Sequence, residues 1–445
     1  MAARLKFDVG FGPAGRRRDE TAPMRLLVLG DFSRTSVSER PPLASRPTHR
    51  VDVDSLDDVI GRLRPKLALP AGETAFARVA DFHPDELIAR LEVFKALGEK
   101  RTHPAASKED LGRLLGKAPE GSAPATTAGP ANGLDAFIHN IVAPHVVRDT
   151  STDTRAYLAG IDFAFANEMR ALLHAPAFQS LEAVWRGAHW LVSSLELDEN
   201  LQLHLFDITR EELLADIVAA QGKISETGLY RALVDRWRNV PGGEGWSAIA
   251  ALIEFGPSAA DIGLLAALGV IASQAGGPLL GGADRALTVE DEEALAGWNA
   301  LRRSEAAPWI ALGAPRVLLR RPYGTRSDPI EAFPFEEFVG APAQEELLWG
   351  NTALALALLI GRAFMARGWD MEPGDEREID DLPAYTFVRD GQTEMQPCGE
   401  HPLTERAINQ LLGAGLVPLA SRRDRHAVVA IRFQSIADPP APLAW

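Results

Sequence analysis

The sequence places one thiol close to one imidazole, in the stretch Cys398-Gly-Glu-His401 near the C-terminus. A thiol can act as a nucleophile when an adjacent imidazole takes its proton and a third group orients that imidazole. No orienting residue is recognisable in this stretch, which is rich in proline and glycine. A hydrolase built on Cys398 or on a histidine is therefore the weakest functional hypothesis. Cys398 is also the single cysteine of the chain, which excludes an internal disulfide and favours a reducing compartment.

Two glycine-containing patterns could bind phosphate, and neither has the context that this requires. Gly10-Phe-Gly-Pro-Ala-Gly15 matches a dinucleotide-binding string, but Pro13 and the charged residues 16–20 stand where a helix should begin. The Gly-Lys pairs at 116 and 222 lack the earlier glycine and the following Ser or Thr of a phosphate-binding loop. The ten histidines show no zinc-binding spacing. We expect no cofactor, no metal and no enzymatic activity.

The composition is that of a globular protein with room for a large core. Of the 445 residues, 46% are apolar and 24% are charged, and the formal net charge is −15. Nucleic-acid binding needs a basic face, and acids follow the one basic triplet, Arg16-Arg-Arg18, at once; we therefore expect no nucleic-acid partner. Residues 347–366 are the best candidate for a membrane span. Asn351 and Arg362 interrupt them, so we interpret this stretch as a buried core helix and expect no membrane insertion.

The first hundred residues indicate a small α/β unit. Residues 26–29 (LLVL) form an apolar run closed by Gly30-Asp31, which is typical of a strand buried on both faces. Ser55 can cap a helix whose apolar residues recur at helical spacing as far as Pro65. A second helix is predicted from about Asp81, with one apolar face formed by Leu87, Leu91, Phe94 and Leu97.

Residues 118–133 (APEGSAPATTAGPANG) differ in kind from their surroundings. They contain three prolines and three glycines but no bulky apolar residue, so they cannot bury side chains and are predicted to form a flexible linker. This divides the chain into an N-terminal domain over residues 1–117 and a C-terminal domain over residues 134–445.

The C-terminal domain is predicted to mix helices with strands. Thr209 and Glu212 have the spacing of a capping box at the start of one helix. Further helices are predicted over 161–173, 178–195, 258–271, 288–303, 344–367 (the longest) and 403–412, and strands over 201–205, 248–255, 317–319, 416–419 and 427–433. The fold class is therefore α/β, or α+β with mixed sheets.

Both ends of the chain carry a strand-like pattern with one apolar face. Apolar positions alternate over residues 4–11 and again over residues 427–433. Such strands either pair within their own domain or complete a sheet in a neighbouring molecule. The apolar residues concerned are Leu5, Phe7, Val9 and Phe11 at one end, and Val429, Ile431 and Phe433 at the other.

Several stretches carry a family resemblance. Residues 178–192 (FQSLEAVWRGAHWLV), 315–324 (PRVLLRRPYG), 348–353 (LWGNTA), 368–369 (GW), 382–383 (LP), 403–406 (LTER) and 415–419 (GLVPL) occur in the order found in the large subunit of the type VI secretion contractile sheath. From about residue 134 onward the chain resembles that subunit. Residues 1–115 resemble the small sheath subunit, less specifically, through 26–33 (LLVLGDFS), 50–54 (RVDVD) and 81–84 (DFHP).

The resemblance implies a contractile-tail sheath-like fold, with the small- and large-subunit portions packed together, and a structural function. Such subunits form a helical polymer in the bacterial cytoplasm, around an inner tube of hexamers and on a baseplate at the inner membrane. The sheath contracts to propel the inner tube, and in most systems a AAA+ ATPase then disassembles it. The implied partners are copies of the same chain, the inner-tube protein, baseplate components and that ATPase. In the family, terminal strands join sheets of neighbouring subunits, which gives the terminal apolar residues above an interface role.

Two features depart from the family pattern. Small and large subunits are normally separate chains, whereas here residues 118–133 join them, which fixes a one-to-one ratio and raises their effective concentration to about the millimolar range. The large-subunit region also begins late, so the part that offers a helix to the ATPase is short. We interpret a helix face formed by Leu134, Phe137, Ile138 and Ile141 as the remnant of that ATPase-recognition helix.

Two other functions fit the same residues. One is the sheath of a related phage-tail-like contractile particle, which neighbouring genes would distinguish from a secretion sheath. The other is a sheath-derived adaptor that no longer polymerises. The adaptor would be a monomer or small oligomer under conditions in which a sheath subunit forms tubes.

Overall fold

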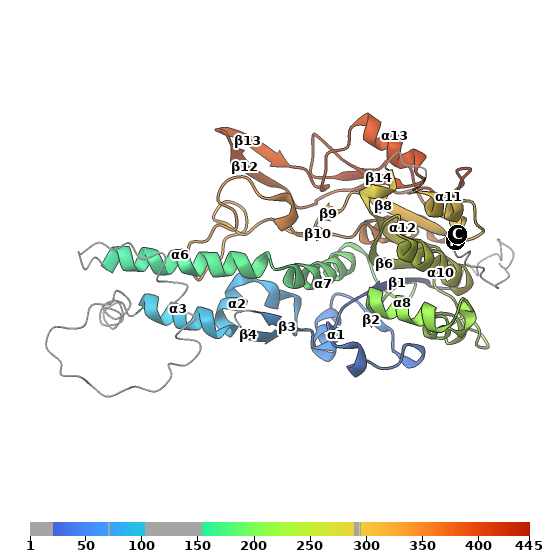
Figure 1. Cartoon of the computed structure of the whole chain (residues 1–445), viewed down its shortest axis with the longest axis horizontal. Helices are drawn as coiled ribbons and strands as arrows, with labels where there is room; N and C mark the ends of the chain where they lie inside the picture. Colours follow the sequence, from blue (N-terminus) through green and yellow to red (C-terminus); the bar gives the residue numbers. More distant parts are fainter. Residues whose placement is uncertain (1–20, 70–71, 103–153, 289–292, 294) are drawn as a thin grey trace.

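The computed structural model describes residues 21–69, 72–102, 154–288, 293 and 295–445 (Figure 1). We call the described residues up to 102 the N-terminal portion and those from 154 onward the C-terminal portion. The predicted strand at 4–11, the predicted linker at 118–133 and the helix face at 134–141 lie outside the described residues.

A nine-stranded mixed sheet forms the centre of the molecule, in the order β11-β15-β14-β8-β7-β6-β1-β5-β2. The strands from β14 through β5 are parallel, while β2 at one edge and β15 and β11 at the other are antiparallel. Their bounds are β1 Met24–Gly30, β2 His49–Val51, β5 Leu201–Asp207, β6 Ala248–Phe255, β7 Leu279–Ala283, β8 Ile310–Ala314, β11 Glu378–Ile379, β14 Val417–Ser421 and β15 Val428–Ala430. The predicted fold class, α/β with mixed sheets, is confirmed.

Strand β1 belongs to the N-terminal portion but lies between two strands of the C-terminal portion. Leu26 is opposite Leu203 of β5 on one side and Ala248 of β6 on the other. Because side chains alternate across a strand, Leu26 and Val28 enter one hydrophobic core and Leu27 and Leu29 enter a second. The prediction of a strand buried on both faces is confirmed. The described part of the first hundred residues contains strands and helices, as predicted, but its strand β1 belongs to a sheet shared with the rest of the chain.

Helices cover both faces of this sheet. On one face α7 (Pro176–Ser194) and α12 (Thr352–Arg367) bury their apolar residues in the first core. On the other face α8 (Arg210–Ala219), α10 (Ala259–Ala275) and α11 (Ala296–Arg302) close the second core. In the described part of the chain, one helical stretch has the length and composition to cross a bilayer, Thr352–Asp370, and 67% of it is buried inside the protein. That burial agrees with the interpretation as a core helix.

The N-terminal portion extends from the sheet along the C-terminal portion. It contains α1 (Leu56–Leu63), the hairpin of β3 (Lys66–Leu69) and β4 (Gly72–Ala75), α2 (Pro84–Arg90) and α3 (Glu92–Thr102). Helix α3 runs beside α6 (Thr154–Leu173), where Arg101 and Asp162 form an ion pair of 2.7 Å (Figure 1). The remaining elements are α9 (Gly228–Tyr230), α13 (Glu405–Gly413), β9 (Val317–Leu318) with β10 (Trp349–Gly350), and the hairpin of β12 (Tyr385–Arg389) with β13 (Gln392–Gln396).

Two helix predictions in the N-terminal portion need correction. The predicted helix from Asp81 is two helices, because Leu91 between α2 and α3 has an extended backbone; its apolar face is nevertheless buried. Ser55 precedes α1 as predicted but does not cap it. Its hydroxyl group donates to Asp52 at 2.7 Å instead.

Three predictions in the C-terminal portion were too long. The predicted helix 344–367 begins at Thr352, because Trp349-Gly350 pairs with β9 and Asn351 then caps the helix. At 16 residues α12 is shorter than α6, which has 20. Of the residues within 288–303 that the structure describes, only Ala296–Arg302 form an α-helix, α11. The last strand ends at Ala430, so Ile431 and Phe433 follow the strand rather than extend it.

Candidate functional site

The cysteine and histidine that could have formed a nucleophilic pair do not have the properties of one. Cys398 is buried, and burial raises the pKa of its thiol to about 11, the opposite of what an activated nucleophile needs. A cavity of about 290 Å³ opens beside β6, β7 and β8 and is lined by Glu400 and His401 but not by Cys398. In that cavity Arg316 binds Glu400 through two hydrogen bonds, of 2.6 and 2.9 Å. Within the described ranges, no group of three or more His, Cys, Asp or Glu side chains could hold a metal ion.

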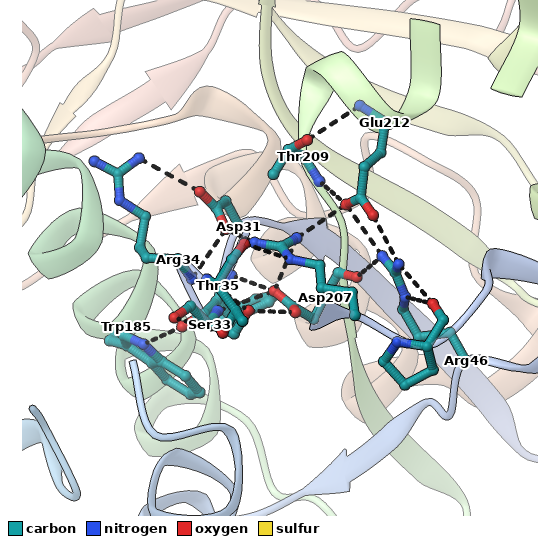
Figure 2. Close-up of polar contacts among 12 residues, drawn as sticks. Asp31, Ser33, Arg34, Thr35, Arg46, Trp185, Asp207, Thr209 and Glu212 are labelled. Atoms are coloured by element: carbon teal, nitrogen blue, oxygen red, sulfur yellow. Dashed lines mark hydrogen bonds and ion pairs between the residues drawn. The ribbon is translucent and has the colours of Figure 1, made fainter. Parts of the chain in front are cut away.

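The most highly organised polar cluster lies at the carboxyl ends of β1 and β5 (Figure 2). We call Asp31, Arg40, Arg46, Asp207 and Glu212 the junction network. Parallel strands bring their carboxyl ends to the same edge of a sheet, so the pairing of β1 with β5 places Gly30 opposite Asp207. The loop that follows β1 therefore starts beside the residues that lead from β5 into α8.

Asp207 fixes the first turn of that loop. Its carboxylate accepts hydrogen bonds from the backbone N–H groups of Phe32, at 2.8 Å, and Ser33, at 2.9 Å, and from the Ser33 hydroxyl at 2.7 Å (Figure 2). Asp207 is only 6% exposed, so these bonds compensate for its lost hydration. The N-terminal portion is thereby held at the end of β1 as well as along it.

Both arginines of the loop donate hydrogen bonds to the Glu212 carboxylate. Arg46 donates to its two carboxylate oxygens at 2.7 and 3.1 Å, and Arg40 donates to one of them at 2.9 Å. Arg40 also contacts Asp31 and lies 3.7 Å from Asp207. The side chains of Arg40, Arg46 and Glu212 are 2%, 5% and 4% exposed, so this is a buried network rather than a surface pair. Burial alone would raise the pKa of Glu212, but the hydrogen bonds from Arg46 and the Thr209 N–H and the charges of Arg46 and Arg40 together lower it.

Glu212 also forms a capping box with Thr209 at the start of α8. The Thr209 side chain accepts from the Glu212 backbone N–H at 3.1 Å, and the Glu212 carboxylate accepts from the Thr209 N–H at 3.0 Å. This is the capping box predicted from the spacing of the two residues, and it is confirmed. The box orients the Glu212 carboxylate toward the loop of the N-terminal portion.

An aromatic cluster joins the two portions in the first core, on the face of β1 that carries Leu26 and Val28. Phe76 and Phe82 stack with ring centroids 4.3 Å apart, and Phe178 of α7 meets both edge-on, at 6.1 and 5.8 Å. Trp185, also on α7, packs on Phe32 at 5.0 Å and donates its indole N–H to the Phe32 carbonyl at 3.0 Å (Figure 2). These rings are all buried. The cluster supplies apolar contact area and the indole supplies one fixed hydrogen bond.

A second buried ionic cluster, within the C-terminal portion, supports α7. Arg320 donates to Glu182 at 2.9 Å and to Glu337 at 2.8 Å, and its guanidinium lies over the ring of Tyr323. Burial alone would raise the pKa of Glu337, but Arg320 and further hydrogen bonds hold it down to about 2. The same segment contacts the N-terminal portion, because Asp85 of α2 accepts from the backbone N–H groups of Glu331 and Ala332.

The predicted interface residues are only partly within the described chain. Leu5, Phe7, Val9 and Phe11, and Leu134, Phe137, Ile138 and Ile141, lie outside it. Val429 is in β15, which pairs with β14 on one side and β11 on the other. Ile431 follows β15 and is 37% exposed, and Phe433 is half-buried. A role of these residues in joining neighbouring molecules stays a prediction.

The junction network itself was not predicted beyond its capping box. Arg40 and Arg46 each directly precede a proline in the sequence, as solvated loop arginines often do. One signal was available: a loop that follows a doubly buried strand must pass the carboxyl end of its neighbours, where helix N-termini and acids gather. The partners of these arginines in the C-terminal portion lie more than 160 positions away, so no local pattern identifies them.

Comparison with known proteins assigns the two portions to two related families. Residues 155–437 match the model of the EvpB/VC_A0108 tail sheath N-terminal domain, called VipB. Residues 3–115 match the model described as type VI secretion system, VipA, VC_A0107 or Hcp2. The type VI secretion system sheath protein TssC1 of Pseudomonas aeruginosa is 29% identical over 317 residues, which cover 66% of this chain. The match covers 63% of the length of TssC1.

Proposed function

This chain belongs to the type VI secretion tail-sheath family, and we propose that it is a structural subunit of a contractile sheath that polymerises around an inner tube and contracts to propel it. The observation that carries the proposal is that one polypeptide matches both the small-subunit family and the large-subunit family. In this proposal each chain supplies one complete subunit of the sheath.

The structure of the junction supports a single mechanical unit. Strand β1 is buried between β5 and β6, and the junction network and the aromatic cluster hold the two portions on both sides of that strand. A unit that transmits a contraction must move as one body, and buried contacts on several sides favour this. We infer that the two portions rotate and slide together when the sheath changes state.

The proposed partners follow from the family. They are further copies of the chain, the hexameric inner-tube protein, components of a baseplate at the inner membrane and a AAA+ ATPase that disassembles the contracted form. The place of assembly in this proposal is the bacterial cytoplasm. The ATPase would grasp the helix face of Leu134, Phe137, Ile138 and Ile141.

The proposed contacts between copies are strands from the ends of the chain. An open helical polymer needs non-closing interfaces, in which one surface of a copy meets a different surface of the next. We propose that the apolar face at 5–11 enters a sheet of a neighbouring copy. Val429, Ile431 and Phe433 take part in the same strand contacts between copies. Contraction is then a switch between two packings of one lattice, and the subunit needs no catalytic chemistry of its own.

Live-cell imaging tests this function. A fluorescent fusion of the chain, expressed in its own host, should form cytoplasmic filaments that extend and then shorten abruptly, and deleting the inner-tube gene should abolish them. Diffuse fluorescence with normal secretion of the inner-tube protein would support a non-polymerising adaptor instead. Filaments that form without a membrane-anchored baseplate would favour the sheath of a phage-tail-like particle.

A further inference from the structure

The contact between the two portions combines two zones of different chemistry. Along β1 and the aromatic cluster it is apolar, and apolar contacts tolerate many sequences of similar volume. At the carboxyl end of β1 it is ionic and buried. The two zones therefore differ in how strictly they select the partner.

The charges of the ionic zone balance only when both portions are present. The N-terminal portion brings the cations of Arg40 and Arg46, and the C-terminal portion brings the carboxylates of Asp207 and Glu212. Asp31, also from the N-terminal portion, is shared between Arg40 and the half-exposed Arg34. A buried charge that loses its partner is strongly destabilising, whereas a complete set of paired charges is not. Each side of the network is thus unfavourable without the other.

We propose that the junction network is a recognition element, which makes the slot between β5 and β6 accept a β1-type strand only when two arginines follow it. The partner that fits is the N-terminal portion of this chain or of another copy. The partner that is rejected is a separate small-subunit-type chain with uncharged side chains at the positions of Arg40 and Arg46. Specificity of this kind comes from penalising the wrong partner rather than from strengthening the right one.

The geometry supports recognition rather than general adhesion. Arg46 meets Glu212 in a two-bond arrangement that requires a fixed orientation, and it also donates to the Asp207 carbonyl at 2.7 Å. The capping box holds Glu212 through contacts within the C-terminal portion, which do not involve the arginines. The ion pair of Arg101 with Asp162 crosses the same boundary but is 36% and 42% exposed, and water can replace either partner there.

A sorting experiment tests the proposal with the full chain. A protease site is placed within residues 118–133, and the purified protein is cut to give two associated chains. One parent is the wild type. The second carries a neutral network, with Arg40→Met, Arg46→Met, Asp207→Asn and Glu212→Gln. The two amides keep the side-chain length of the acids and one acceptor oxygen each. The cut parents are mixed, unfolded in urea and refolded, each C-terminal chain is recovered by its own tag, and mass spectrometry counts the bound N-terminal chains.

The proposal predicts that each C-terminal chain re-associates with the N-terminal chain of its own parent. Each C-terminal chain should recover its own type of N-terminal chain in an excess of about a hundred-fold, because mixed pairs bury unpaired charge. A control parent with Arg101→Met and Asp162→Asn should mix statistically with the wild type. Statistical mixing of the neutral-network parent, or preference of both C-terminal chains for the wild-type N-terminal chain, would overturn the proposal.

A second measurement on uncut protein covers the case in which the cut chains fail to refold. Three full-length variants are compared by urea unfolding: the two arginine substitutions alone, the two acid substitutions alone, and all four together. If the network is a recognition element, the fourfold variant should unfold at a higher urea concentration than either double variant, because each double variant leaves buried charges without partners and the fourfold variant does not. Additive losses would contradict the proposal. Neither measurement depends on tube formation, so the sheath function and the recognition role can fail separately.

Discussion

Arg46 donates hydrogen bonds to both carboxylate oxygens of Glu212, at 2.7 and 3.1 Å, although 166 positions separate the two residues in the chain. The pair closes the carboxyl end of a sheet whose central strand comes from one portion and whose flanking strands come from the other. It explains how a chain with two subunit-like halves forms one folded body.

Removing the Glu212 carboxylate should destabilise the whole protein. Glu212→Ala leaves Arg40 and Arg46 buried beside fewer acids and opens the capping box, so the free energy of unfolding should fall by about 3–5 kcal/mol. Urea unfolding measures the loss. Glu211→Ala is the matched control, because Glu211 is the exposed neighbour on the same helix turn and its loss should cost little. Equal effects of the two substitutions would show that the junction network contributes nothing beyond a surface charge.

Acid should destabilise the protein in part through Glu337. Its pKa is about 2 in the folded state against an ordinary 4.5, so the stability it contributes is present above pH 4.5 and is lost as the pH falls toward 2. The contribution is at most about 3 kcal/mol. The free energy of unfolding of Glu337→Gln should be lower at neutral pH and should fall less steeply over this window.

Glu336→Gln serves as the control for that measurement, since Glu336 is adjacent in sequence and exposed. Its unfolding free energy should follow the wild-type pH dependence. If the Glu337→Gln profile is as steep as that of the wild type, the low pKa of Glu337 is not a source of acid sensitivity.

The Cys398 thiol should be inert in the folded protein. With a pKa raised to about 11 by burial, only a very small fraction is thiolate at pH 7.5, and the side chain is enclosed. Iodoacetamide should label it slowly in buffer and rapidly in urea, as mass spectrometry can follow. Cys398→Ala should assemble and contract like the wild type. Rapid labelling of the native protein, or loss of function in Cys398→Ala without loss of stability, would reopen the case for a catalytic cysteine.

The N-terminal apolar face should be needed for assembly but not for folding. Replacing its four apolar residues by serine should abolish tubes while leaving the urea unfolding midpoint unchanged, because a strand donated to a neighbouring copy makes its stabilising contacts there. Replacing the polar residues that alternate with them should leave tubes intact. The test set is Leu5, Phe7, Val9 and Phe11, and the control set is Arg4, Lys6 and Asp8. Normal tubes from the test variant would exclude strand donation by this segment.

The sequence predicted well the features that depend on neighbouring residues. The apolar run at 26–29 is continuous because β1 has a core on each face, and the spacing of Thr209 and Glu212 is enough to specify a capping box. The α/β class and most strand positions follow from the same local periodicity. These features need no information from distant parts of the chain.

The sequence predicted poorly what depends on distant residues. The insertion of β1 between β5 and β6 is set by strand pairing across more than 170 positions, and an apolar strand carries no mark of its partners. The predictions of helix ends were also inaccurate. The pairing of Trp349-Gly350 with β9 delays the start of α12, and the break at Leu91 divides a helix whose apolar pattern continues unbroken.

Electron microscopy of the purified chain with its inner-tube protein shows directly whether this polypeptide forms a sheath. A sheath subunit should give hollow, striated tubes built from this single polypeptide, with density for β1 between β5 and β6 in every subunit. A monodisperse monomer under all conditions tested would contradict it, as would tubes in which a separate small-subunit chain occupies the place of β1.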